Sequence, residues 1–116
     1  MTEEGKTLIV TIVAKGCGDR AMEASIKAGA EGGTIIFGRG VGIHEKKKVL
    51  GVLIEPEKEI VLTVTPPDQA DAILDAIVAA TRLEEPGRGI AFTIRVDRFV
   101  GAVHSLLTDP PGGACT

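Results

Sequence analysis

Four short runs of apolar, largely β-branched residues divide this chain. They lie at 6–16, 32–38, 59–64 and 89–96, and glycine, proline or charged residues bound them. Runs of this length and composition predict β-strands. In the last run Ile90, Phe92, Ile94 and Val96 point to one side, and Ala91, Thr93 and Arg95 point to the other. This single-faced pattern is typical of an antiparallel sheet with helices on one side.

Two segments between these runs carry the signals of helices. The segment 18–30 ("GDRAMEASIKAGA") offers Asp19 as a cap for the helix start. The segment 65–82 carries the stronger signal, because its apolar residues recur at a spacing of three and four. Thr65 stands three residues before Asp68 in a capping-box arrangement, and the proline after Thr65 fits the first helical position.

The resulting order is strand–helix–strand, followed by a second strand–helix–strand. We therefore predict an α+β protein with the ferredoxin-like βαββαβ sandwich, in which two helices cover one face of a four-stranded antiparallel sheet. The domain is expected to span 1–104. The connection 38–58 is long for a hairpin and is therefore a candidate functional loop, and the Pro/Gly-rich tail 105–116 is expected to be flexible.

The length and charge of the chain exclude several classes of protein. At 116 residues it fits one domain, and its 44% hydrophobic content suffices for a core. A net charge of −3 and only 3% aromatic residues argue against nucleic-acid binding. No apolar run is long enough to span a bilayer, and the acidic start "MTEEGKTLIV" is unlike a secretory signal. Cys17 and Cys115 form no disulfide framework, so we expect a cytoplasmic protein without direct membrane insertion.

The chain lacks the residue patterns of the common catalytic and metal sites. His44 and His104 have no partner at a metal-ligand spacing, and no GxSxG, HExxH or Walker A motif is present. Cys17 precedes a helix start, where a thiol can become reactive, but no activating base can be named. We therefore predict that the protein is not an enzyme and binds no metal.

The connection 38–58 combines a basic run with an apolar one. The "EKKK" run at 45–48 is either a basic docking patch or a solvated loop tip. The "VLGVLIEP" run at 49–56 is either an exposed patch that binds a partner or an extension of the third strand that is buried between subunits. We favour burial in an oligomer, with the basic tip left free.

The sequence Gly-Arg-Gly occurs twice, at 38–40 and at 87–89, each time next to a predicted strand. Each occurrence alone is compatible with a simple turn. Glycine also allows the backbone to approach a ligand closely, and arginine suits phosphate or carboxylate. If subunits of a ring brought the two turns together, their backbone N–H groups would form an anion site with Arg39 and Arg88 as charge partners.

Several of these segments resemble the PII signal-transduction family. "GGTIIFGRGVG" at 32–42 resembles the family's second strand running into its long T-loop, and "PGRGIAF" at 86–92 resembles its B-loop and the following strand. The resemblance implies a nitrogen-regulatory homotrimer whose intersubunit clefts bind an adenine nucleotide. It also implies that residues 41–56 act as a T-loop, which docks on a membrane transporter or an enzyme and controls it.

The two turns and the family's motifs together give the candidate binding residues. They are Thr34, Gly38, Arg39, Gly40, Val41, Gly42, Val64, Gly87, Arg88, Gly89 and Ile90. Ile90 stands where the resemblance implies a phosphate-binding lysine, and Gly101 and Val103 stand where it implies arginines. Fewer cations weaken binding to a triphosphate. The identity of the nucleotide is nonetheless left open between AMP, ADP, ATP and a cyclic nucleotide.

Two alternative functions stay open. One is a trimeric interaction module that captures its partner without any small molecule. The other is a small phosphate-ester hydrolase on the same sandwich, because a fold does not fix a function. Turnover of a ligand would identify the hydrolase, although the sequence offers no general base or metal cluster for it.

Overall fold

The computed structural model describes the chain at 5–41, 47–49, 52–54 and 56–101, with side chains described at 5–41 and 56–101. The elements are β1 (Lys6–Ala14), α1 (Gly18–Lys27), β2 (Thr34–Arg39), β3 (Lys47–Val49), β4 (Val52–Ile54), β5 (Glu57–Thr65), α2 (Pro67–Thr81) and β6 (Gly89–Val96). The last of these covers the same residues as the fourth run predicted from the sequence.

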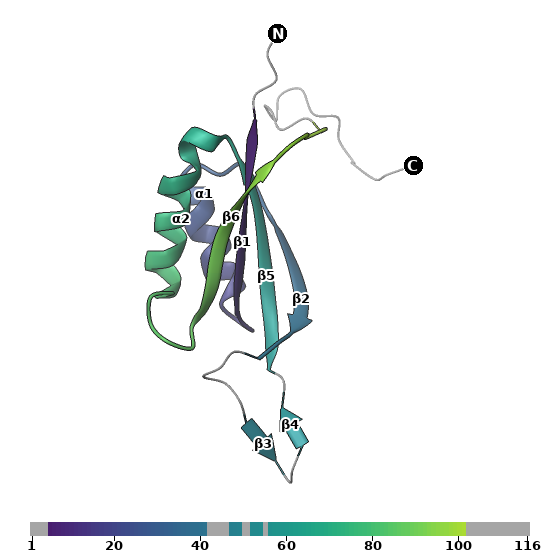
Figure 1. The fold of residues 1–116 in the computed structure, drawn as a ribbon. Helices are drawn as coiled ribbons and strands as arrows, with labels where there is room; N and C mark the ends of the chain where they lie inside the picture. Colours follow the sequence, from purple (N-terminus) through teal and green to yellow (C-terminus); the bar gives the residue numbers. More distant parts are fainter. Residues whose placement is uncertain (1–4, 42–46, 50–51, 55, 102–116) are drawn as a thin grey trace, which may run out of the picture.

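The main sheet has the strand order β2–β5–β1–β6, and all three neighbouring pairs are antiparallel. Both helices lie on one face of this sheet, and each connects two strands that have another strand between them (Figure 1). This arrangement confirms the predicted ferredoxin-like sandwich. Within the described ranges, no helix has the length and apolar character needed to cross a membrane.

The core lies between the sheet and the two helices. Ile9 of β1 and Val61 of β5 are fully buried in one cluster with Ala21 of α1 and with Ile73 and Ile77 of α2. Since Ile73 and Ile77 lie about one helical turn apart, the apolar stripe seen in the sequence is the face that α2 buries. Burial of a large aliphatic side chain contributes about 1.5–3 kcal/mol.

The opposite face of the sheet carries the larger apolar side chains. Directly opposed residues of antiparallel strands point to the same side. We call this side the open face, and its apolar residues are Leu8, Val10, Ile12, Ile36, Ile60, Leu62, Val64, Ile90, Phe92, Ile94 and Val96. One row of it consists of four isoleucines, at positions 36, 60, 12 and 90. No described helix covers this face (Figure 1).

The helices therefore lie on the side of β6 that carries its smaller side chains. Gly89, Ala91 and Thr93 of that strand share the side of Ile9, whereas Ile90 and Phe92 point away from the helices. Ile90 is 57% exposed and Phe92 is 40% exposed. The alternation in the sequence identified the strand correctly, but the bulkier of its two sides is the one left open.

A carboxylate from β5 holds the start of α1. Oε1 of Glu59 accepts a hydrogen bond from the backbone N–H of Gly18 at 2.7 Å, and Glu59 is buried. A negative charge at this position satisfies one free helix N–H and faces the positive end of the helix dipole. The prediction that Asp19 caps the helix is wrong, because Cys17 is the N-cap residue and Asp19 lies in the first turn.

The start of α2 also differs from the prediction. The helix begins at Pro67 with Pro66 as its N-cap residue, and Thr65 is the last residue of β5. The Thr65 hydroxyl donates to the carbonyl of Pro66 at 3.2 Å instead of accepting from a helix N–H. The predicted capping box is therefore wrong. The first helical position is Pro67 and not Pro66 as predicted, and a proline there has no N–H to leave unpaired.

The connection between β2 and β5 contains a second, two-stranded antiparallel sheet formed by β3 and β4. It extends beyond one end of the main sheet (Figure 1). Lys47 and Lys48 lie in β3, opposite Ile54 and Leu53 of β4. That the basic run is a docking patch or a solvated tip stays a prediction. The expectations for the rest of the basic run and for the tail 105–116 lie outside the described residues.

We expect Glu59→Ala to lower the free energy of unfolding by about 1.5–3 kcal/mol, because a buried N–H loses a charged acceptor. Urea unfolding followed by circular dichroism measures the change. Glu23→Ala, at an exposed position of α1, is the matched control and should change stability by less than about 0.5 kcal/mol. Equal losses in the two variants would contradict the role of Glu59.

Candidate functional site

The two Gly-Arg-Gly turns lie at the same end of the sheet but at opposite edges. Gly38, one residue before the end of β2, lies opposite Lys58 of β5, and Gly89 begins β6 opposite Val13 of β1. The strands β5 and β1 lie between them, so three strand spacings, or about 14 Å, separate the two edges. One small anion cannot contact both turns of one chain, and a shared site needs a second subunit.

The first turn leads into a loop whose two ends are tied together. The backbone N–H of Gly40 donates to the carbonyl of Pro56 at 3.1 Å. Next to it, the Lys15 ammonium pairs with Oε1 of Glu57 at 2.9 Å, and this hydrogen bond raises the pKa of Lys15. Arg39 lies directly opposite Glu57 across the β2–β5 pair and is exposed. The loop therefore starts from a fixed base with an exposed guanidinium beside it.

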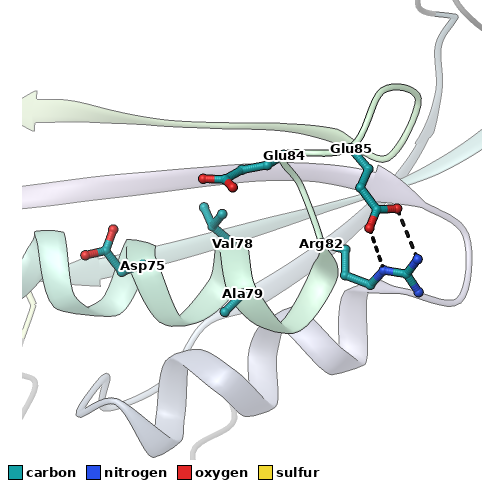
Figure 2. A pocket seen from close by; sticks show the side chains of 6 residues that line it. All are labelled: Asp75, Val78, Ala79, Arg82, Glu84 and Glu85. Atoms are coloured by element: carbon teal, nitrogen blue, oxygen red, sulfur yellow. Dashed lines mark hydrogen bonds and ion pairs between the residues drawn. The ribbon is translucent and has the colours of Figure 1, made fainter.

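The second turn, 82–89, is held by its own side chains. Arg82 adopts a left-handed conformation with φ of 57° and ends α2. Its guanidinium donates to both carboxylate oxygens of Glu85 at 3.0 and 3.1 Å (Figure 2). The hydrogen bond from Arg82 holds the pKa of the Glu85 carboxyl below its usual value. Arg82 and Glu85 thus neutralise each other within the turn.

Arg88 also binds within its own chain. Its Nε and Nη2 groups both donate to the carbonyl of Thr81 at 3.2 Å, at the last residue of α2. A cation at this position satisfies a free helix carbonyl and faces the negative end of the helix dipole. Only the Nε–Nη2 edge of the planar guanidinium makes these hydrogen bonds, so its remaining N–H groups keep their capacity to donate.

Gly89 is required by the packing of the turn. Its φ is +136°, a conformation that side-chain-bearing residues rarely adopt. A Cβ atom there would overlap the carbonyl oxygen of Ile12 and lie 3.2 Å from the Cα of Val13. Gly87 also has a positive φ, of 81°. The glycines fix how the backbone of the turn approaches β1.

The other candidate residues divide between the two edges of the open face. Thr34 lies opposite Leu62, two residues from Val64, so Thr34 and Val64 are neighbours near the β2 edge. Ile90 lies at the β6 edge. Val41 is exposed beyond the end of β2, and Gly42 lies outside the described residues. A single subunit brings Thr34 and Val64 together but keeps Ile90 apart from them.

Two charged residues near the first turn were missed by sequence reasoning. Lys58 and Glu59 are each only 8% exposed, and the Cγ atom of Lys58 lies 3.8 Å from the position of a Cβ built on Gly40. Adjacent strand residues point to opposite faces, so Lys58 belongs to the side of Gly38 and Glu59 to the helix side. The signal was a charged pair, Lys58 and Glu59, where the run at 59–64 begins, and such a pair reads as an exposed strand end.

The described residues offer no group suited to a metal ion. No cluster of three or more His, Cys, Asp or Glu side chains occurs among them. Cys17 is a free thiol and half-buried. His44, His104 and Cys115 lie outside the described ranges. The described part of the site thus consists of backbone amides, arginines and apolar side chains, which suit binding of an anion that has an apolar part.

The chain matches a protein-family model described as nitrogen regulatory protein P-II over residues 6–102. No curated protein matches it. A solved Bacillus cereus protein related to NIF3 has a similar fold, with a TM-score of 0.65 and 19% identity over 84% of this chain. This chain spans 27% of the length of that protein.

A second solved structure is Arabidopsis thaliana PII bound to citrate. It has a TM-score of 0.61 and 23% identity, and the match covers 81% of this chain and 79% of that one. At these identities, the two structural likenesses show that the fold is shared.

Gly89→Ala is expected to lower the free energy of unfolding by about 1–3 kcal/mol, since it forces a Cβ into a disallowed backbone conformation. Gly32→Ala is the control, because nothing lies within 4 Å of its Cβ position. That variant should be neutral or about 0.4–1 kcal/mol more stable. Chemical unfolding of both variants tests the difference, and a Gly89→Ala protein as stable as wild type would refute it.

Proposed function

Because this chain belongs to the nitrogen regulatory protein P-II family, we propose that it is a non-enzymatic regulatory homotrimer that binds an adenine nucleotide between its subunits. The match over residues 6–102 confirms the resemblance drawn from the sequence. The single observation that carries the proposal is the open face, an apolar sheet surface that no described helix covers.

The open face supports an assembly of several copies. Monomeric soluble proteins rarely leave a contiguous apolar patch of this kind in water. Burial of such a face contributes about 25 cal/mol per Å² of apolar surface removed from water. A second copy offers the same apolar surface, and the ring of three copies proposed from the family would bury all of these faces together.

The ligand site would form where two subunits meet. Within one chain the two glycine turns lie at opposite sheet edges, so neighbouring copies placed edge to edge would bring the 38–40 turn of one close to the 87–89 turn of the next. Backbone N–H groups exposed by glycine would then bind phosphate oxygens. Arg39 and the unused N–H groups of Arg88 would supply the charge, and Thr34 and Val64 would contact the base.

The residue at position 90 bears on the class of ligand. Ile90 supplies no charge where the resemblance implies a lysine, so an adenine nucleotide with few phosphates, such as AMP, ADP or a cyclic nucleotide, fits better than ATP. The citrate bound to the Arabidopsis thaliana PII supports an anionic ligand in general. Each charge-assisted hydrogen bond that a missing cation would have made is worth about 1.5–3 kcal/mol.

The loop 41–56 would report the ligand state to a partner in the cytoplasm, a membrane transporter or an enzyme. Its base, Gly40 bound to Pro56, adjoins the proposed phosphate contacts. A ligand that contacts the two states of the loop differently shifts their populations. The partner would then meet one loop arrangement when the cleft is filled and another when it is empty.

We expect the wild-type protein to be a trimer by size-exclusion chromatography with light scattering, and Ile36→Glu to dissociate it. Ile36 lies on the open face and is 46% exposed. Ile26→Glu, on α1 with 50% exposure, is the matched control and should stay trimeric. A monomeric wild-type protein at working concentration would overturn the proposed assembly.

Titration calorimetry with AMP, ADP, ATP and cyclic AMP should show binding of at least one of them. Arg39→Ala is expected to weaken that binding by about tenfold or more, because it removes a charge-assisted contact. Arg20→Ala removes the same charge from an exposed position of α1 and should leave binding unchanged. An absence of heat with every nucleotide would favour the ligand-independent interaction module, and release of phosphate would favour the hydrolase.

A further inference from the structure

Three charged residues form a row across the main sheet at the end where the loop 41–56 begins. Arg39 lies directly opposite Glu57 in the β2–β5 pair. On the other side of Glu57, the backbone N–H of Lys15 donates to the Glu57 carbonyl at 3.3 Å, one residue beyond the paired part of β1. Opposed residues share a face, so all three lie on the helix side with Glu59. We call Lys15, Glu57 and Arg39 the charged row.

The carboxylate of the row is bound by one of its two cations. Nζ of Lys15 lies 2.9 Å from Oε1 of Glu57, and this hydrogen bond raises the pKa of Lys15. Within the described residues, the Arg39 guanidinium makes no side-chain hydrogen bond or ion pair. The strands that carry Lys15 and Arg39 lie two spacings, or about 10 Å, apart. Both long side chains can therefore reach an anion that takes the place of the carboxylate.

The ion pair between Lys15 and Glu57 is easily exchanged. The two side chains are 66% and 62% exposed, and exposed pairs of this kind contribute little to stability. Glu59, two residues further along β5, differs because it is buried and holds the start of α1. Of these two carboxylates, Glu57 is therefore the one that another anion can displace without disturbing the core.

The charge of the entering anion decides whether the exchange is favourable. A phosphate monoester carries a charge of about −1.5 to −2 at pH 7 and has three acceptor oxygens, which exceeds what the single carboxylate of Glu57 offers. Lysine and arginine therefore gain charge-assisted hydrogen bonds when such a group replaces the carboxylate. A phosphodiester has the same charge as a carboxylate, so it gains nothing by the exchange.

We propose that the charged row binds the terminal phosphate of the ligand, and that Glu57 is the internal anion which this phosphate displaces from Lys15 and Arg39. Lys15 is thus an anion-binding residue that the sequence did not identify. The inference rests on the proposed function for the rest of the ligand, and it favours AMP or ADP over a cyclic nucleotide. The exchange takes place beside the hydrogen bond from Gly40 to Pro56 that closes the loop.

The test uses the full-length protein and inorganic phosphate, because the row lies within one chain and this probe needs neither a trimer nor a base. An NMR titration that follows the backbone amide of Gly40 measures the affinity. Glu57→Gln should bind phosphate about tenfold more tightly than wild type, since the cations lose their internal anion. Lys15→Gln should bind it about tenfold more weakly than wild type, since a cation is lost. Dimethyl phosphate, a diester, should bind the wild-type protein more weakly than inorganic phosphate does.

A matched variant separates the row from general charge attraction. Asp71→Asn removes the same charge from an exposed position of α2, which follows the far end of β5, and should leave the affinity for phosphate unchanged. Phosphate binding to Glu57→Gln that is absent, no tighter than wild type, or matched by Asp71→Asn would overturn the exchange.

Calorimetry of wild type and Glu57→Gln with AMP separates this inference from the proposed function. Tighter binding of AMP by the variant would support both. If phosphate responds as expected and no nucleotide binds, the row keeps its role and the nucleotide function fails. If AMP binds wild type and the variant equally, the nucleotide function stands and the row is not its phosphate site.

Discussion

The main sheet is apolar on both faces, and the two helices that the structure describes cover only one of them. The helices lie on the face where β6 presents Gly89, Ala91 and Thr93, small residues that let α2 approach the strand. The bulkier set, with Ile90 and Phe92, is left for another surface to cover. The proposed association would therefore be a consequence of how the residues of each strand alternate, and the positions of both glycine turns relative to a neighbour would follow from it.

The two turns reach a fixed shape by different means. The first depends on register, since pairing of β2 with β5 places Arg39 beside Glu57 and Lys15 holds that carboxylate. The second depends on side chains that return to their own backbone, as Arg88 does to Thr81. Both arrangements are held by contacts within the chain, so a ligand in the proposed cleft would lose less entropy in ordering the site.

The order of elements and the family could be predicted from the sequence, because apolar spacing and turn residues are local signals. The same local reasoning failed at the helix starts. The acceptor for α1 is Glu59, which is 41 residues away from Gly18 in the chain. Local spacing instead pointed to Asp19, next to the helix start. A helix cap supplied by a distant strand depends on tertiary packing, and the spacing of residues near the helix start carries no signal of it.

The candidate site could be predicted only in part for a related reason. Its glycines could be identified from the sequence, and Gly89 has a positive φ that explains why glycine stands at that position. Arg88 donates to Thr81 across a turn that begins with Arg82 in the left-handed conformation, which is unusual for an arginine and leaves no sequence signal. The proposed relation between the two turns would belong to an assembly, and one chain does not contain it.

The hydrogen bond between Gly40 and Pro56 closes the β2–β5 pair just before the chain leaves the sheet. The stability of the sandwich therefore depends little on the length of the loop beyond this hydrogen bond. Each doubling of the loop length adds only about 0.6 kcal/mol of closure entropy. Such a scaffold can exchange the segment between Gly40 and Pro56 for one of another length or composition while the sheet and its helices keep their packing. A new segment can thus be grafted here without redesign of the core.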